Sequence, residues 1–152
     1  MERPLVVTDS SDAVVEVIRE AGELAAATDA PLLVLTVVTE SEYEKDVDVL
    51  GTIDRVERSG FEPDPEEYAE KVAQTAINDL LSDLALEAEA VGKYVEDDND
   101  QADAILDVAA ANDCDYVFLL GRKRSPTGKA LFGDTAQSVI LNFDGYVVTM
   151  AE

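Results

Sequence analysis

The chain has 152 residues and 47% of them are hydrophobic, so it can bury one continuous core without disulfides or metal ions. Its 34 acidic residues against 11 basic residues give a net charge of −23, which argues against nucleic acid and anionic membranes as partners. It contains no histidine, which excludes Ser-His-Asp and Cys-His catalysis and the commonest zinc sites. We therefore expect a single domain over residues 1–152.

The acidic residues are spread along the whole chain and are not gathered in a tail. Asp and Glu alternate with Val, Leu, Ala and Ile from end to end, while Lys is scarce. This pattern indicates a solvated acidic surface over an ordinary core. The sequence predicts a halophilic protein that is adapted to a salt-rich cytoplasm and loses stability when the salt is removed.

The beginning of the chain, "MERPLVVTDSSD", lacks the apolar centre of a signal peptide, and no apolar run reaches the roughly 18 residues that a membrane span needs. Cys114 is the only cysteine, so no internal disulfide can form. Aspartates on both sides of it indicate an inert packing residue. We expect a cytoplasmic location.

The first half of the chain predicts two buried strands around one helix. The apolar run at 4–8 predicts a strand, and the turn-forming residues 9–12 lead into an amphipathic helix from Ala13 to about Thr28. A strand at 31–38 is apolar at nearly every position, as strands covered on both faces are. Residues 39–63 are irregular and charged, and we expect an irregular flap that holds a short helix.

The second half repeats the alternation of helix and strand. Asp64 followed by Pro65 predicts the start of a long helix. The later elements are a strand at 88–96, a helix at 99–113, a strand at 115–121, a helix from about Asp134 to Leu141, and a strand at 145–150. Strands that alternate with helices pair in parallel through right-handed crossovers. The predicted fold is a single-domain doubly wound α/β sandwich, a five-stranded mainly parallel sheet with helices on both faces.

In such a sheet, ligands bind beyond the carboxyl ends of the strands, where the loop at 121–134 is expected. This loop contains three glycines and precedes a helix, so its backbone N–H groups suit a phosphate. It also holds four of the eleven basic residues, Arg122, Lys123, Arg124 and Lys129. These residues either bind an anion or pair with carboxylates of the same chain or of a partner subunit.

Two common phosphate motifs are absent. A P-loop would need a glycine at position 123 and a hydroxyl at position 130, where the chain has Lys123 and Ala130. The dinucleotide fingerprint fails because "TDSSDA", after the first strand, contains no glycine.

Several features together resemble the universal stress protein family. They are Asp9 after the first strand, "LTVV" in the second strand, the helix start "DQADAIL", and "LLG" before a glycine-rich loop and a Gly-polar helix start. The resemblance covers nearly the whole chain. It implies the fold predicted above, homodimers formed through the last strand, and membership of either an ATP-binding or a non-binding group.

ATP-binding members carry Gly-x2-Gly-x9-Gly-Ser/Thr after the fourth strand, and this chain departs from that pattern. Gly121 matches the first glycine, but Arg124 stands at the second, and Gly133 comes one residue early and is followed by Asp134. Counted without a gap, Asp134 takes the third glycine position and Thr135 the hydroxyl position. The Asp134 carboxylate would either repel a phosphate or cap the helix itself.

The resemblance implies a site for an adenine nucleotide, ATP or AMP, with Mg²⁺ if the ligand is ATP. Asp9 would contact the adenine or simply cap the helix, and Val37 and Val38 would line the adenine pocket or belong to the core. The implied site residues are Asp9, Ser10, Val37, Val38, Gly121, Arg122, Lys123, Arg124, Gly133, Asp134 and Thr135.

The preferred hypothesis is a regulatory binding protein that is not an enzyme, with no catalytic residue and no metal site of its own. The apolar last strand would pair with its twin in a homodimer through Tyr146, Val147, Val148 and Thr149. One rival is the same dimer without nucleotide, acting as a protein-interaction scaffold. A second rival is a pyrophosphatase-type enzyme that uses ATP, which the absence of glycine in residues 9–12 disfavours.

Overall fold

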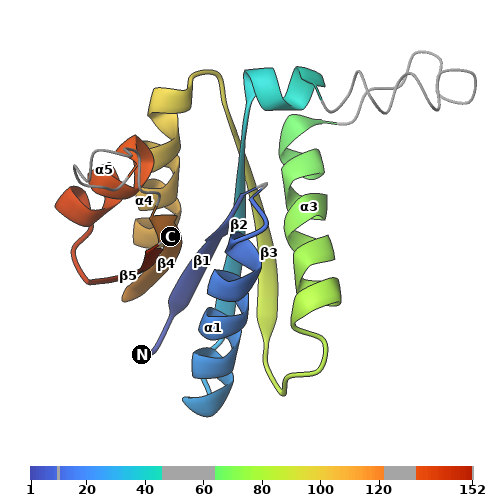
Figure 1. Cartoon of the computed structure of the whole chain (residues 1–152), viewed down its shortest axis with the longest axis vertical. Helices are drawn as coiled ribbons and strands as arrows, with labels where there is room; N and C mark the ends of the chain where they lie inside the picture. The colour runs from blue at the N-terminus through green and yellow to red at the C-terminus, as the bar shows by residue number, and fades with distance from the viewer. Residues whose placement is uncertain (10, 46–63, 122–132, 152) are drawn as a thin grey trace, which may run out of the picture.

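The computed structural model describes residues 1–9, 11–45, 64–121 and 133–151. Its five strands form one sheet in the order β3-β2-β1-β4-β5, and every neighbouring pair is parallel. The predicted doubly wound α/β fold is therefore confirmed (Figure 1). The elements are β1 (Pro4–Thr8), α1 (Val14–Ala27), β2 (Leu32–Thr39), α3 (Pro65–Leu80), β3 (Ala88–Val95), α4 (Gln101–Ala111), β4 (Tyr116–Gly121), α5 (Asp134–Asn142) and β5 (Tyr146–Ala151).

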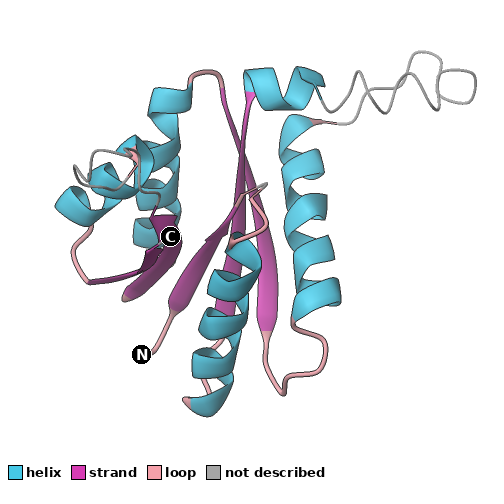
Figure 2. Cartoon of the chain, viewed as in Figure 1, coloured by secondary structure: helices cyan, strands magenta, loops and turns pink. Residues whose placement is uncertain are grey.

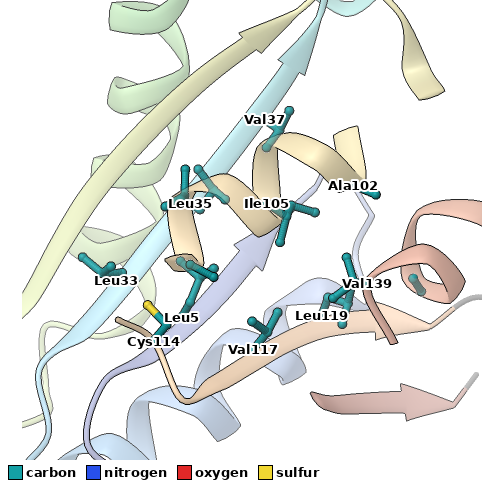
Figure 3. Packing of buried hydrophobic residues seen from close by; sticks show 13 residues of the cluster. Leu5, Leu33, Leu35, Val37, Ala102, Ile105, Cys114, Val117, Leu119 and Val139 are labelled. Carbon is teal, nitrogen blue, oxygen red and sulfur yellow. The ribbon is translucent and has the colours of Figure 1, made fainter. Parts of the chain in front are cut away.

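Helices cover both faces of the sheet and enclose two separate apolar cores (Figure 2). One core packs side chains of α1 and α3 on one face, and the other packs side chains of α4 and α5 on the opposite face. β2 is buried at every position because it lies inside the sheet with both faces covered. Figure 3 shows the α4 side, where Ile105 of α4 belongs to the same core as Leu5, Leu35 and Val117 of the strands.

α3 packs very closely on the edge strand β3. The helix presents two small residues to the sheet, Ala69 and Ala73, and both are fully buried. On the strand, Gly92 faces the helix backbone, so no side chain holds the two elements apart at that point. The close approach depends on small residues on both elements.

The predicted flap begins one residue later than expected. Thr39 is the last residue of β2 and is completely buried, and residues 40–45 are helical. The Thr39 hydroxyl accepts a hydrogen bond from the backbone N–H of Glu42 at 3.3 Å and donates one to the Glu42 carboxylate at 3.0 Å. Thr39 therefore caps the start of the helix through its hydroxyl, which satisfies one backbone N–H of the first turn. The rest of the flap, residues 46–63, lies outside the described residues.

Candidate ligand site at the carboxyl edge of the sheet

The winding of the chain reverses between the two central strands. β1 continues outward to β2 and β3 on one side, whereas β4 and β5 lie on the other side. β1 and β4 pair only as far as Val6 and Phe118, although β1 stays paired with β2 up to Thr8 and β4 stays paired with β5 up to Gly121. The two strands thus lose contact with each other at their carboxyl ends, which is where open α/β sheets bind ligands.

Asp9 follows β1 at this edge and is exposed. Its Oδ1 accepts a hydrogen bond from the N–H of Ser11 at 2.7 Å, and the Ser11 hydroxyl accepts one from the N–H of Ala13 at 3.1 Å. The N-cap of α1 is Ala13, without a side-chain capping bond. Asp9 thus orders the turn ahead of the helix and does not cap it, because five residues, 9–13, separate the strand from the helix. Ser10 lies outside the described residues.

A pair of buried threonine hydroxyls at the same edge was not predicted. Thr8 and Thr36 lie side by side in β1 and β2, and their Oγ1 atoms form a hydrogen bond of 2.6 Å. Within the described part of the chain, no buried side-chain nitrogen or oxygen lacks a partner. The two hydroxyls therefore satisfy each other inside the sheet. A threonine near the end of each of two adjacent strands is the sequence signal that would have found them.

Val37 and Val38 do not point into one pocket. Successive side chains of a strand lie on opposite faces of the sheet. Val37 belongs to the core beneath α4 and α5, whereas β2 residues of even number, such as Val34, belong to the core beneath α1 and α3 (Figure 3). The two valines therefore cannot lie on the same face of the sheet, and an adenine pocket at this strand stays a prediction. Only Val37 lies on the face that α5 covers.

The loop after β4 is described only at its two ends. Gly121 is buried as the last residue of β4, and Gly133 is the N-cap of α5 with extended backbone at φ −66° and ψ 165°. Asp134 is the exposed first residue of α5, so the expectation that it caps the helix is wrong by one position. Thr135 follows it and is partly buried. The predicted residues Arg122, Lys123, Arg124 and Lys129 lie outside the described residues.

Tyrosine rings and negatively charged side chains lie together near the carboxyl ends of β2 and β3. The ring of Tyr43 makes edge-to-face contacts with Tyr68 and Tyr94, with ring centroids 5.8 and 6.2 Å apart. Burial raises the pKa of the Tyr94 hydroxyl, and the carboxylates of Glu40 and Glu96 raise it further. A phenol is harder to ionise where the surrounding potential is negative.

Other groups in the described part of the chain do not add a metal or redox site. No cluster of three or more Cys, Asp or Glu residues that could hold a metal ion occurs among the residues placed by the structure. Cys114 is buried in the core beneath α4, and this burial raises the pKa of its thiol, as expected for a packing residue. Over the same residues, no helix is both long and apolar enough to cross a membrane.

Comparison with models of protein families matches residues 1–149 to the universal stress protein family. The chain belongs to the universal stress protein family. A comparison with curated proteins gave no significant match.

Solved structures of universal stress proteins have the same fold. One from Archaeoglobus fulgidus is 25% identical, with a TM-score of 0.64, and the match covers 98% of each chain. Another from Archaeoglobus fulgidus, solved in complex with dAMP, is 20% identical with a TM-score of 0.59 and covers 98% of this chain and 97% of that chain. A universal stress protein in complex with cAMP is 19% identical with a TM-score of 0.55 and covers 99% and 96%.

In this universal stress protein, the predicted site residues that the structure describes lie after β1, at the ends of β2 and β4, and at the start of α5. Asp9 follows β1, and Gly121 ends the adjacent strand β4. Gly133 and Asp134 open α5, the helix that follows the loop from β4. Asp9 and Gly121 thus lie just beyond the part of β1 and β4 that is paired.

Proposed function

We propose that the protein binds an adenine nucleotide, AMP or ATP, at the carboxyl ends of β1 and β4, and that occupancy serves a regulatory role outside metabolism. The observation that carries the proposal is the early end of β1–β4 pairing, at Val6 and Phe118, in a chain of the universal stress protein family. This is the position at which a doubly wound sheet accepts a ligand. Two similar structures contain dAMP and cAMP, which supports an adenine ligand.

The proposed contacts divide between the base and the phosphate. Asp9 and Ser10, after β1, and the Val37 side of β2 would hold the adenine. Gly121 and the N-terminal turn of α5 would face the phosphate, because a helix N-terminus presents free N–H groups and a partial positive charge. The loop residues Arg122, Lys123 and Arg124 would add charge-assisted hydrogen bonds. For ATP, a Mg²⁺ ion would enter with the ligand.

Binding without efficient turnover is the activity that the residue types favour. The chain has no histidine, the residue that most often serves as a general base in enzymes. We therefore propose a binding module and expect any hydrolysis of ATP to be slow.

Asp134→Ser tests the proposal by restoring the family's hydroxyl at the first position of α5. If the nucleotide phosphate binds close to the Asp134 carboxylate, the change removes about 1 kcal/mol of repulsion from the binding free energy. Affinity should then rise about fivefold. Isothermal titration with AMP and with ATP plus Mg²⁺, in molar KCl, measures this gain. The matched control is Ser138→Asp, which adds a charge one turn further along α5. We expect it to lower affinity by a smaller factor than the factor by which Asp134→Ser raises it. Absence of binding by both the unchanged protein and Asp134→Ser would refute the proposal.

We further propose a homodimer that forms through β5. This strand is an edge of the sheet, and large apolar side chains lie exposed on it and beside it: Tyr146 at 64%, Leu141 at 72% and Ile140 at 37%. An apolar edge strand is stabilised when a second copy covers it. Light scattering in molar KCl should give twice the mass of the chain, and Tyr146→Glu should give the single-chain mass. A monomer in the unchanged protein would contradict this arrangement.

The same dimer without nucleotide, acting as a protein-interaction scaffold, is the second candidate, and the departures from the ATP-binding motif at Arg124 and Asp134 favour it. We also propose a halophilic, cytoplasmic setting, which the net charge of −23 supports.

A further inference from the structure

We propose that the paired hydroxyls of Thr8 and Thr36 position the end of β1 for ligand binding. The inference rests on the proposed function and adds a positioning element that is built into the sheet beside the proposed site. The two hydroxyls are buried and bonded to each other, so they do not have to touch the ligand. They act through Asp9, which follows Thr8 directly.

The end of β1 is held by a neighbouring strand on one side only. Val6 has a partner strand on each side, because it pairs with both β2 and β4. Thr8 lies beyond the residues of β1 that pair with β4, and its partner in the sheet is Thr36 of β2. A strand end with one neighbour opens more easily than a strand with two. The free side is the gap between β1 and β4, where we place the ligand, so the position of Thr8 sets the shape of that gap.

The facing side chains change from apolar to polar within this one-sided stretch. On the face beneath α1 and α3, the cross-strand pair Val6–Val34 is followed by the pair Thr8–Thr36. Valine and threonine have nearly the same shape, so a second pair of valines would fill the space. Burial of two hydroxyls is unfavourable unless they form a hydrogen bond, and their Oγ1 atoms lie 2.6 Å apart. The pair therefore adds a directional bond between the strands at a position where packing alone needs only valine.

The turn that follows Thr8 starts from the same strand end. Asp9 Oδ1 accepts a hydrogen bond from the Ser11 N–H at 2.7 Å, and the Ser11 hydroxyl accepts one from the Ala13 N–H at 3.1 Å. These two bonds lead from the end of β1 to the start of α1. A shift of the strand end moves Asp9 with it and weakens the contact that we propose between Asp9 and the adenine base.

Replacement of both threonines by valine separates positioning from packing. Thr8→Val or Thr36→Val alone leaves one buried hydroxyl without its partner and should destabilise the protein. Thr8→Val/Thr36→Val removes both polar groups and should recover most of the lost stability, because apolar groups of the same shape can replace a hydrogen-bonded pair at little cost. Urea unfolding in molar KCl measures these differences. The positioning role predicts that the double variant is stable but still binds nucleotide weakly.

Two further measurements in molar KCl follow the turn and the ligand. Solvent exchange of the Ser11 and Ala13 N–H groups, measured by NMR without ligand, should be at least about threefold faster in the double valine variant. Isothermal titration should give about fivefold lower affinity for AMP and for adenosine alike, the order of effect of one neutral hydrogen bond. Thr8→Ser/Thr36→Ser keeps both hydroxyls and should restore exchange and affinity to within about twofold of the unchanged protein.

The outcomes separate this inference from the proposed function. A stable double valine variant that binds AMP as tightly as the unchanged protein would overturn the inference and leave the proposed function standing. Unchanged exchange at Ser11 and Ala13 would overturn it whether or not a nucleotide binds. Equal defects in the double serine and double valine variants would also contradict it, because the serines keep the hydrogen bond. Absence of nucleotide binding by the unchanged protein would overturn both.

Discussion

Gly92→Ala is expected to lower the free energy of unfolding by about 2–3 kcal/mol, because overpacking against a fixed backbone costs this much. A Cβ at this position would lie 2.3 Å from the backbone nitrogen of Glu70 and 2.5 Å from the carbonyl oxygen of Glu66. Helix backbone cannot yield as a side chain can, so α3 would have to move away from β3. Urea unfolding followed by circular dichroism in molar KCl measures the loss.

Gly22→Ala is the matched control, since it adds the same methyl group in a different setting. Its Cβ would meet the Leu81 side chain, with the Cδ2 atom at 2.5 Å, and a terminal methyl can rotate away. Alanine also favours the helix over glycine by about 1 kcal/mol, which offsets the contact. We expect a change within about 1 kcal/mol. Equal losses in the two variants would contradict the close packing of α3 on β3.

Removal of salt is expected to destabilise the protein strongly. The net charge of −23 repels itself, and the Debye length grows from about 3 Å at 1 M to about 30 Å at 0.01 M salt. We expect the melting temperature to fall by at least about 10 °C between molar and millimolar KCl. At the lowest salt concentrations we expect the protein to unfold at room temperature. Differential scanning fluorimetry across a KCl series measures the effect.

A variant with fewer charges tests the cause of the salt dependence. Glu20, Glu70, Glu89 and Asp107 are exposed acids on different elements. Replacing them by Gln or Asn should reduce the slope of melting temperature against the logarithm of salt concentration, because self-repulsion falls with charge. A melting temperature that does not change with KCl would contradict the halophilic interpretation.

The fold was predictable because its signals are local and agree with one another. The apolar runs of β1, β2 and β4 have no polar face, so they indicate strands covered on both sides. The segments between these strands have the hydrophobic spacing of helices, and strands connected by helices pair in parallel. Pro65 after Asp64 located the start of α3, and the Asp64 carboxylate does accept a hydrogen bond from the N–H of Glu66.

The helix ends were less predictable, because they depend on backbone conformations that residue type only weakly indicates. Two residues beyond the ends of α1 and α4, an aspartate adopts the left-handed region, Asp29 at φ 59° and Asp113 at φ 53°. Glycine is the usual residue in this conformation, and aspartate adopts it less often. An aspartate after a helix is therefore a weak signal of the helix end. The hydrogen bond from the Ala30 N–H to the Ala25 carbonyl closes the first of these ends.

The site was predictable in outline and less so in detail. The structure confirms that Asp9 follows β1 and that Gly121 ends the adjacent strand β4, whereas their part in nucleotide binding stays a prediction. The resemblance to the family did not indicate that Val37 and Val38 face opposite sides, a consequence of strand geometry that a motif does not encode. The Thr8–Thr36 hydroxyl pair depends on strand register, which becomes known only when the sheet is assembled.

Identification of the ligand that accompanies the protein tests the central claim most directly. The protein would be purified gently in molar KCl and denatured, and the released small molecules would be identified and counted by mass spectrometry. The account predicts an adenine nucleotide at a stoichiometry approaching one per chain. A protein that releases none, and that also fails to bind added AMP or ATP with Mg²⁺ in molar KCl, would contradict the account and leave the dimer surface as the site of function.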